Sequence, residues 1–201
     1  MVKQWIKDYW LVAVGAVGLA IAGVYGINYY RQSQITALSD TAAQTAKVTQ
    51  DLQANRLAEA ETLTASLQNE QKDTSFSVIA TLALAKKLFD EKKYTEAVRQ
   101  YDWLIANAGD LAMRDIGRLR KARAQANAGQ HDAAIDTLAG LEGQASLNEA
   151  TLLKGDILLQ AKQYAAAKST YETLQGNETL NPQLIQQRLD LLNIKQQQSE
   201  Q

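Results

Sequence analysis

The chain of 201 residues contains no cysteine, one proline and one histidine. Without cysteine it can form no disulfide, no thiolate metal site and no cysteine nucleophile. Proline and aromatic residues are scarce while alanine, leucine and glutamine are abundant, a composition that favours helices over strands. Basic residues number 21 and acidic residues 22, so no excess of one charge points to nucleic acid. These absences predict an all-α protein with no nucleic-acid partner.

Signatures of catalysis and cofactor binding are also missing from the sequence. It has no GxxxxGK[ST] or GxGxxG segment to cradle a phosphate or a dinucleotide. His131 alone would have to serve any Ser-His-Asp arrangement or histidine metal site. It stands where other repeats of the chain have tyrosine, which favours a packing role. We therefore predict no catalytic residue, no metal site, no cofactor and no small-molecule substrate.

One long uncharged run lies near the N-terminus, between Asp8 and Arg31. A transmembrane helix needs roughly 20 apolar residues to cross about 30 Å of hydrocarbon, and aromatic residues at both ends of this run are typical of the membrane interface. The run is too long for the apolar region of a cleaved signal peptide. We predict a short N-terminus over residues 1–8 and one uncleaved transmembrane helix over residues 9–30.

Basic residues near this predicted span indicate its orientation in the lipid bilayer. Lys3 and Lys7 precede the span and Arg31 follows it, a bias that favours a cytoplasmic N-terminus. Small residues recur at every fourth position within the span and share one helix face: Gly18, Ala22 and Gly26. That face would let a partner helix approach closely, although membrane spans in general also tolerate glycine and alanine.

From residue 31 onward the chain repeats itself. Four segments carry a bulky residue, alanine three positions later, a bulky residue or threonine after four more, and leucine after another three. They are Leu57, Ala60, Thr64 and Leu67; Tyr94, Ala97, Tyr101 and Leu104; His131, Ala134, Leu138 and Leu141; and Tyr164, Ala167, Tyr171 and Leu174. Successive alanines lie 37, 37 and 33 residues apart, close to the 34-residue period of tetratricopeptide repeats.

The spacings of three and four place each set on one helix face, with alanine where two helices cross closely. Each set therefore predicts the second helix of a hairpin. In the first helices of the last three hairpins, another small residue stands twelve positions before the alanine: Ala85, Ala122 and Gly155. Between repeats, glycine-containing segments at 107–110, 140–143 and 176–177 are predicted to end helices in left-handed turns.

The repeats are followed by Asn181 and Pro182, which are typical of an N-cap and a first helical residue. An apolar stripe continues from there: Leu184, Ile185, Leu189, Leu192 and Ile194. The predicted fold is thus an all-α chain with one transmembrane helix, a tetratricopeptide-like solenoid over residues 31–180, and a capping helix with a polar tail over residues 181–201.

First helices line the concave surface in similar repeat proteins, and six of their side chains are expected to face one shared space: Leu82, Lys86, Phe89, Leu119, Arg123 and Asn127. Apolar surface with a few donors suits an extended or helical peptide better than a small metabolite. Arg123 belongs to a basic run in which Arg114, Arg118 and Lys121 share one helix face and Arg120 and Arg123 another. A merely solvated outer face is the alternative interpretation of this run.

The chain resembles the YfgM-like ancillary subunits of the Sec translocon, which carry a tetratricopeptide-like domain. The resemblance is strongest over residues 118–123 with Gly129 and 132–138, and over 153–158 with Ala167 and Tyr171. It extends over the whole chain in the order of its parts, from a short N-terminus through one span and the repeats to a C-terminal helix.

This resemblance implies a non-enzymatic scaffold in the bacterial inner membrane, with its repeats in the periplasm. The implied partners are the channel proteins of the Sec translocon and a membrane-anchored periplasmic chaperone or prolyl isomerase. The protein would then help to bring chaperones to emerging secreted chains. A membrane-anchored adaptor that sequesters a signalling or envelope-assembly partner is the alternative function.

Overall fold

The computed structural model describes residues 2–72, 74–177 and 180–199, including all of their side chains except those of residues 2–22, 34 and 37. Within these residues the chain is helical and contains no strand, which confirms the predicted all-α class. The helices are α1 (Val2–Gln53), α2 (Leu57–Glu70), α3 (Ser75–Asp90), α4 (Tyr94–Asn107), α5 (Leu111–Asn127), α6 (His131–Ala139), the 3-10 helix η1 (Gln144–Ser146), α7 (Leu147–Gln160), α8 (Tyr164–Glu172) and α9 (Pro182–Ser199).

The chain forms two compact units, one up to residue 44 and one from residue 45 onward, and α1 contributes to both. Among the described residues, no helix combines the length and the apolar character needed to cross a membrane. The predicted span at 9–30 falls largely on residues 9–22, whose side chains, Gly18 and Ala22 included, lie outside the described part. A Cβ built on Gly26 would have no atom within 4 Å. The transmembrane helix and the domain boundaries remain predictions.

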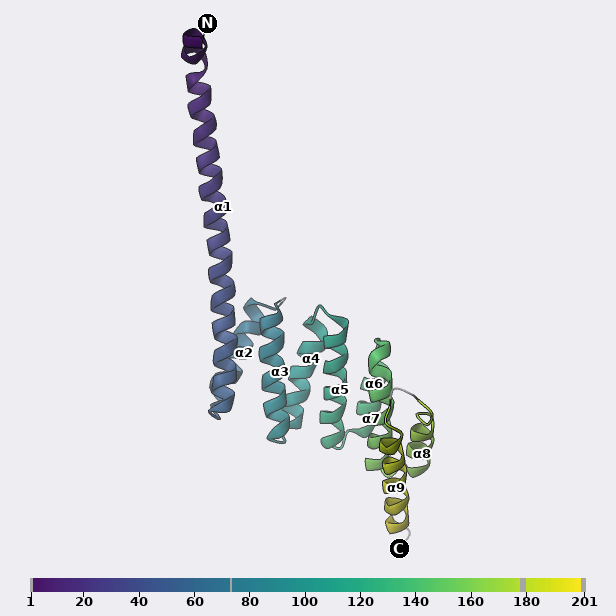
Figure 1. Ribbon diagram of the computed structural model, residues 1–201. Coiled ribbons are helices and arrows are strands. Elements are labelled where there is room, and N and C mark those ends of the chain that lie inside the picture. Colours follow the sequence, from purple (N-terminus) through teal and green to yellow (C-terminus); the bar gives the residue numbers. More distant parts are fainter. Residues whose placement is uncertain (1, 73, 178–179, 200–201) are drawn as a thin grey trace. The chain divides into compact units, whose positions relative to one another are not determined.

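The second unit is a row of helical hairpins that follow one another in chain order (Figure 1). Its second helices, α2, α4, α6 and α8, begin at the first residue of the four patterned segments. The alanines of the pattern are completely buried, as close helix crossings require: Ala60, Ala97, Ala134 and Ala167. The predicted repeat is confirmed, and the last turns of α1, with Val48 and Leu52 in the core, supply the first helix of the first hairpin.

One backbone turn recurs in all four hairpins. Two positions before each second helix, the backbone adopts left-handed φ angles of 56° to 79°: Asn55, Lys92, Gly129 and Lys162. The next amide donates to the carbonyl oxygen five residues earlier at 2.8–2.9 Å, which is the helix-ending bond of a Schellman motif. Each hairpin therefore closes by the same local geometry, with glycine in only one of the four.

The predicted left-handed turns between repeats are found only at Gly176, where φ is 78°. Gly140 and Gly143 have φ of −83° and −87°, so their backbone is open to any residue. At 107–110 the helix ends because Ala108 is extended. Gly143 is required for space instead, because a Cβ there would lie 2.7 Å from the Asp115 carboxylate. The predicted left-handed turn is therefore confirmed at 176–177 and wrong at 107–110 and 140–143.

The last helix, α9, packs against the last hairpin. Ile185, Leu189 and Leu192 join the core cluster that contains Tyr171 and Leu174. The backbone amide of Gln183 donates to Asn181 Oδ1 at 2.9 Å, which confirms the predicted N-cap. Of the predicted stripe, Ile194 is half exposed and lies outside this core.

Candidate functional site

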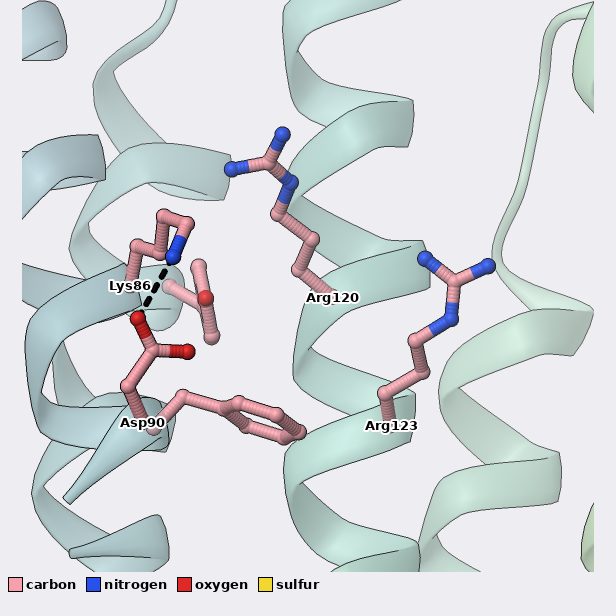
Figure 2. Close-up of a pocket in the computed structure, with 6 residues that line it drawn as sticks. Lys86, Asp90, Arg120 and Arg123 are labelled. Atoms are coloured by element: carbon pink, nitrogen blue, oxygen red, sulfur yellow. Dashed lines mark hydrogen bonds and ion pairs between the residues drawn. The ribbon is translucent and has the colours of Figure 1, made fainter. Parts of the chain in front are cut away.

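A pocket of about 270 Å³ lies between α3, α4 and α5, and we call it the proximal pocket (Figure 2). Three of its residues come from α3, one from α4 and two from α5: Lys86, Phe89 and Asp90; Tyr101; and Arg120 and Arg123. The α3 residues are spaced three and four apart and so share one helix face. Ala85 and Ala122, completely buried, allow the close packing that sets Lys86 and Arg123 at the pocket.

Three of the six residues predicted for the groove line this pocket: Lys86, Phe89 and Arg123. Leu119 is 4% exposed and belongs to the core around α6 and α7, so its assignment to the groove is wrong. It shares its helix face with Ala122 and Ala126, which are buried in the same cluster. Leu82, half-buried, packs against the core cluster shared by the first and second hairpins, and the exposed Asn127 side chain donates to the Arg123 carbonyl oxygen at 2.8 Å.

Three residues of the proximal pocket were not predicted from sequence. Asp90 lies four positions after Lys86, the spacing of a helical ion pair, and Arg120 lies three before Arg123 on the same face. These spacings could have revealed both. Tyr101 is part of the buried repeat pattern and is only 2% exposed, so its sequence signal was that of a core residue.

The charges around the proximal pocket are only partly compensated. Lys86 Nζ lies 2.5 Å from Asp90 Oδ2, and Arg123 Nη2 lies 2.8 Å from Glu149 Oε1 on α7. Figure 2 shows the Lys86–Asp90 pair on α3 opposite Arg120 and Arg123 on α5. Within the described part of the chain, the Arg120 guanidinium has no ion-pair or hydrogen-bond partner. One cation therefore remains available beside the pocket wall.

Phe89 and Tyr101 supply the apolar part of that wall. Phe89 also packs edge-on against Tyr94 with ring centroids 5.4 Å apart, which fixes its orientation. Burial raises the pKa of the Tyr101 phenol above its usual value, so this group stays neutral at physiological pH. The pocket therefore offers aromatic surface, a neutral hydroxyl and a free guanidinium, a combination suited to binding a side chain.

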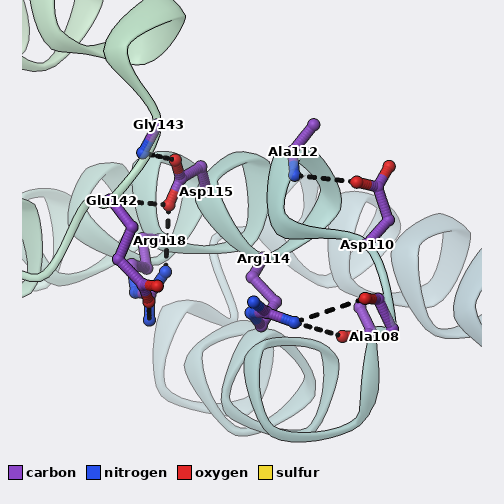
Figure 3. Close-up of polar contacts among 9 residues, drawn as sticks. Ala108, Asp110, Ala112, Arg114, Asp115, Arg118, Glu142 and Gly143 are labelled. Atoms are coloured by element: carbon purple, nitrogen blue, oxygen red, sulfur yellow. Dashed lines mark hydrogen bonds and ion pairs between the residues drawn. The ribbon is translucent and has the colours of Figure 1, made fainter.

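The other face of the basic run serves the fold (Figure 3). Arg114 Nη1 donates to the carbonyl oxygens of Ala108 and Gly109 at 3.1 and 3.4 Å. Arg118 bridges Asp115 and Glu142, and Lys121 Nζ lies 2.6 Å from Asp102 Oδ1. The predicted division of the run into two faces is confirmed, and only the face with Arg120 and Arg123 borders the pocket.

Asp115 ties the loop after α6 to α5. Its buried carboxylate accepts hydrogen bonds from the amides of Gly143 at 2.7 Å and Glu142 at 3.3 Å, and from Arg118 at 2.9 Å (Figure 3). Burial opposes its ionisation, but these three donors outweigh burial and hold the pKa of Asp115 below its usual value. This network positions the third and fourth hairpins and shares no residue with the proximal pocket.

Comparison with known proteins places the chain in a family. A family model described as a tetratricopeptide repeat-like domain matches residues 3–194. The ancillary SecYEG translocon subunit of Aggregatibacter actinomycetemcomitans is 30% identical over 192 residues, which are 95% of this chain and 94% of the relative. The chain belongs to this tetratricopeptide repeat-like family. The resemblance noted from its residues is thereby confirmed.

Two further relatives carry the same name. The ancillary SecYEG translocon subunit of Haemophilus influenzae is 25% identical over 191 residues, 94% of this chain and 93% of the relative. That of Escherichia coli is 28% identical over 164 residues, 80% of this chain and 77% of the relative. No solved structure matches the chain. Among the residues that the structure describes, no group of three or more His, Asp or Glu side chains could hold a metal ion.

Proposed function

We propose that this chain is a non-enzymatic ancillary subunit of the Sec translocon whose repeat unit docks a segment of another protein in the proximal pocket. The observation that supports docking at this pocket is the unpaired Arg120 guanidinium beside the aromatic wall of Phe89 and Tyr101. Such a mixture of apolar surface and a few polar groups is typical of sites that recognise side chains of a peptide. The names of the relatives, matched over nearly their whole length, supply the translocon as the setting.

The membrane anchor of this proposal is the span over residues 9–30, with the N-terminus in the cytoplasm and the repeat unit in the periplasm. The uncharged run and the basic residues before it support this arrangement. Gly18, Ala22 and Gly26 form a face on which a helix of a channel protein can pack. Protease added to spheroplasts should then digest the chain beyond residue 32, and full protection of that part would refute the orientation.

The second partner of the proposal is a membrane-anchored periplasmic chaperone or prolyl isomerase, docked at the proximal pocket. The resemblance to YfgM-like subunits supports it, and so does a pocket suited to a side chain of a docked segment. Through two contacts, one in the membrane and one at the repeats, the chain would hold a folding factor beside the channel.

Affinity purification of the full chain from detergent extracts tests the two contacts separately. Wild type should recover both the channel proteins and the chaperone. Arg120→Glu should lose the chaperone and keep the channel, whereas leucine at Gly18, Ala22 and Gly26 should lose the channel. Arg120 is a sharper choice than Arg123, because reversing Arg123 would also set two carboxylates together at Glu149.

A matched control is Arg99→Glu, which makes the same charge change on an exposed residue of α4 that does not line the pocket. Arg114→Glu is unsuitable, because Arg114 holds the end of α4 through the Ala108 and Gly109 carbonyls. If wild type recovers no channel protein and instead recovers a signalling or envelope-assembly protein, the sequestering adaptor replaces the translocon subunit as the function.

A further inference from the structure

A second pocket of about 460 Å³ lies between α7, α8 and α9, and we call it the distal pocket. It is lined by residues from all three elements and the turn between α7 and α8: Asp156, Leu159, Gln160, Lys162, Tyr164, Arg188, Leu191 and Lys195. Neither the repeat pattern nor the predicted groove residues include its charged members.

The distal pocket is the repeat equivalent of the proximal pocket. Lys86 and Asp156 directly follow Ala85 and Gly155, the two small residues at equivalent helix crossings. In the same register, Phe89 corresponds to Leu159, and Asp90 to Gln160. Each pocket is also lined by the helix that follows the hairpin, which is α5 for the proximal pocket and α9 for the distal one, whereas the contribution of the second helix differs, with Tyr101 in the first and Tyr164 in the second. Equivalent faces of the two first helices α3 and α7 therefore each border a pocket.

The distal pocket also carries unpaired positive charge. Its one carboxylate, Asp156, is already engaged, because Arg188 Nε lies 2.8 Å away and the Tyr171 hydroxyl donates to it at 2.8 Å. Lys162 and Lys195 have no ion-pair partner among the described residues. Leu191, 39% exposed, leaves apolar surface beside these cations. Both pockets thus combine a free cation with an apolar wall, in a chain whose formal net charge is −1.

Contacts between α5 and α7 connect the two pockets. Arg123 of the proximal pocket pairs with Glu149 at the start of α7, and Gln160 of the distal pocket donates to the Ala126 carbonyl oxygen of α5 at 3.2 Å. A residue of each pocket thus contacts the helix that carries part of the other pocket. A single extended ligand that occupies both pockets would therefore run across the neighbouring helices α5 and α7.

We propose that the two pockets together bind one extended polypeptide segment that carries an acidic side chain for each pocket, with apolar residues beside them. This inference rests on the proposed docking function and specifies the chemistry of the docked segment. A carboxylate complements Arg120 at one pocket and Lys162 and Lys195 at the other. The apolar walls favour a polypeptide over a polyphosphate chain, which would instead need a broad basic surface.

Fluorescence anisotropy with the full chain in detergent tests the proposal. The probe is a labelled peptide with two Glu-Leu pairs joined by a Gly-Ser spacer, and its control carries Gln in place of both Glu residues. The Gln peptide should bind about tenfold more weakly, and Arg120→Glu and Lys195→Glu should each weaken binding of the Glu peptide by about tenfold. Arg99→Glu should bind as wild type does. Binding should also weaken with added salt.

Several results would overturn the proposal. Equal affinity for the Glu and Gln peptides would remove the acidic requirement, and an unchanged affinity in Lys195→Glu would remove the distal pocket. Displacement of the peptide by short-chain phosphatidylglycerol at lower concentration than by unlabelled peptide would assign the pockets to lipid headgroups. Circular dichroism checks that each variant is folded, and Arg120→Gln and Lys195→Gln replace any reversal variant that is not.

The copurification of channel proteins from detergent extracts is a separate measurement of the proposed function. If the channel is recovered but the peptide shows no preference for glutamate, only the inference about acidic segments fails. If the Glu peptide binds through both pockets but no channel protein is recovered, only the translocon role fails.

Discussion

Gly155→Ala adds one methyl group at the tightest helix crossing of the last hairpin. A Cβ there would lie 2.3 Å from Cε1, 2.7 Å from Cδ1 and 2.9 Å from Cζ of Tyr171. Real carbon contacts are found at about 3.5–4.0 Å, so the ring must move by more than an ångström. Tyr171 is 0% exposed and its hydroxyl is bonded to Asp156, which leaves the ring no free direction.

The expected magnitude follows from two opposing effects. Alanine favours the helix over glycine by about 1 kcal/mol, because Gly155 lies inside α7. Overpacking a filled core costs about 1–3 kcal/mol, and loss of the Tyr171 hydrogen bond to a carboxylate costs about 1.5 kcal/mol or more when fully buried. Asp156 is about one third exposed, which reduces that last cost. The net loss in free energy of unfolding should be about 1–3 kcal/mol.

A second substitution tests whether steric conflict is the cause. The third hairpin has Ala122 and Leu138 at the positions of Gly155 and Tyr171, and both are buried in one cluster. The double variant Gly155→Ala with Tyr171→Leu should therefore be more stable than the sum of the two single effects predicts. Tyr171→Phe measures the hydroxyl contribution alone, since the ring is retained.

The assay is urea unfolding of the full chain followed by circular dichroism. With a slope of about 1–3 kcal/mol per molar urea, Gly155→Ala should lower the midpoint by roughly 1 M. A midpoint equal to or above that of wild type would show that the crossing is looser than the contacts indicate. Strict additivity in the double variant would show that the two residues do not conflict.

Three further substitutions test the fold. Ala134→Leu should destabilise the chain by about 1–3 kcal/mol through overpacking, while Ala133→Leu, the same change on the exposed neighbour, should leave the urea midpoint nearly unchanged. Gly129→Ala should cost about 1–2 kcal/mol although space is open around it, because its φ is 79°; an unchanged midpoint would refute that origin. Asp115→Asn should lower stability at pH 7 by about 1–3 kcal/mol. Because the pKa of Asp115 is held low in the folded chain, its stabilisation is complete above about pH 4 and disappears as pH falls further. The difference in stability between this variant and wild type should therefore shrink as pH falls below about 4, and a difference that stays constant would contradict this origin.

The resemblance of one repeat to the next was sufficient to locate the hairpins. The spacing of alanine and bulky residues is a local property of each helix, because residues three and four apart share a face whatever lies opposite. For this reason α4, α6 and α8 begin at Tyr94, His131 and Tyr164, as the pattern predicts. The N-cap at Asn181 is equally local, since its side chain bonds an amide two residues away.

The functional face could be predicted only in part. Sequence spacing places Arg120 and Arg123 together and separates them from Arg114, which is borne out by the structure. It could not decide whether Leu119 faces the groove or the core, because that depends on which neighbouring helix covers each face of α5. Leu119 is covered from α6 and α7, whereas Arg120 is left without a partner in the described part of the chain.

The sequence alone therefore determined the helices, their pairing into hairpins and the repeat register, which follow from patterns within about one repeat length, and also the family, which follows from a resemblance along the whole chain. Tertiary structure decided the hydrogen bond between Asp115 and Gly143 and the two pockets. Asp115 lies on α5 and Gly143 lies in the loop after α6, and the distal pocket is lined by residues of α7 and α9. Such contacts depend on how successive hairpins stack, and no short-range spacing in the chain encodes the stacking angle.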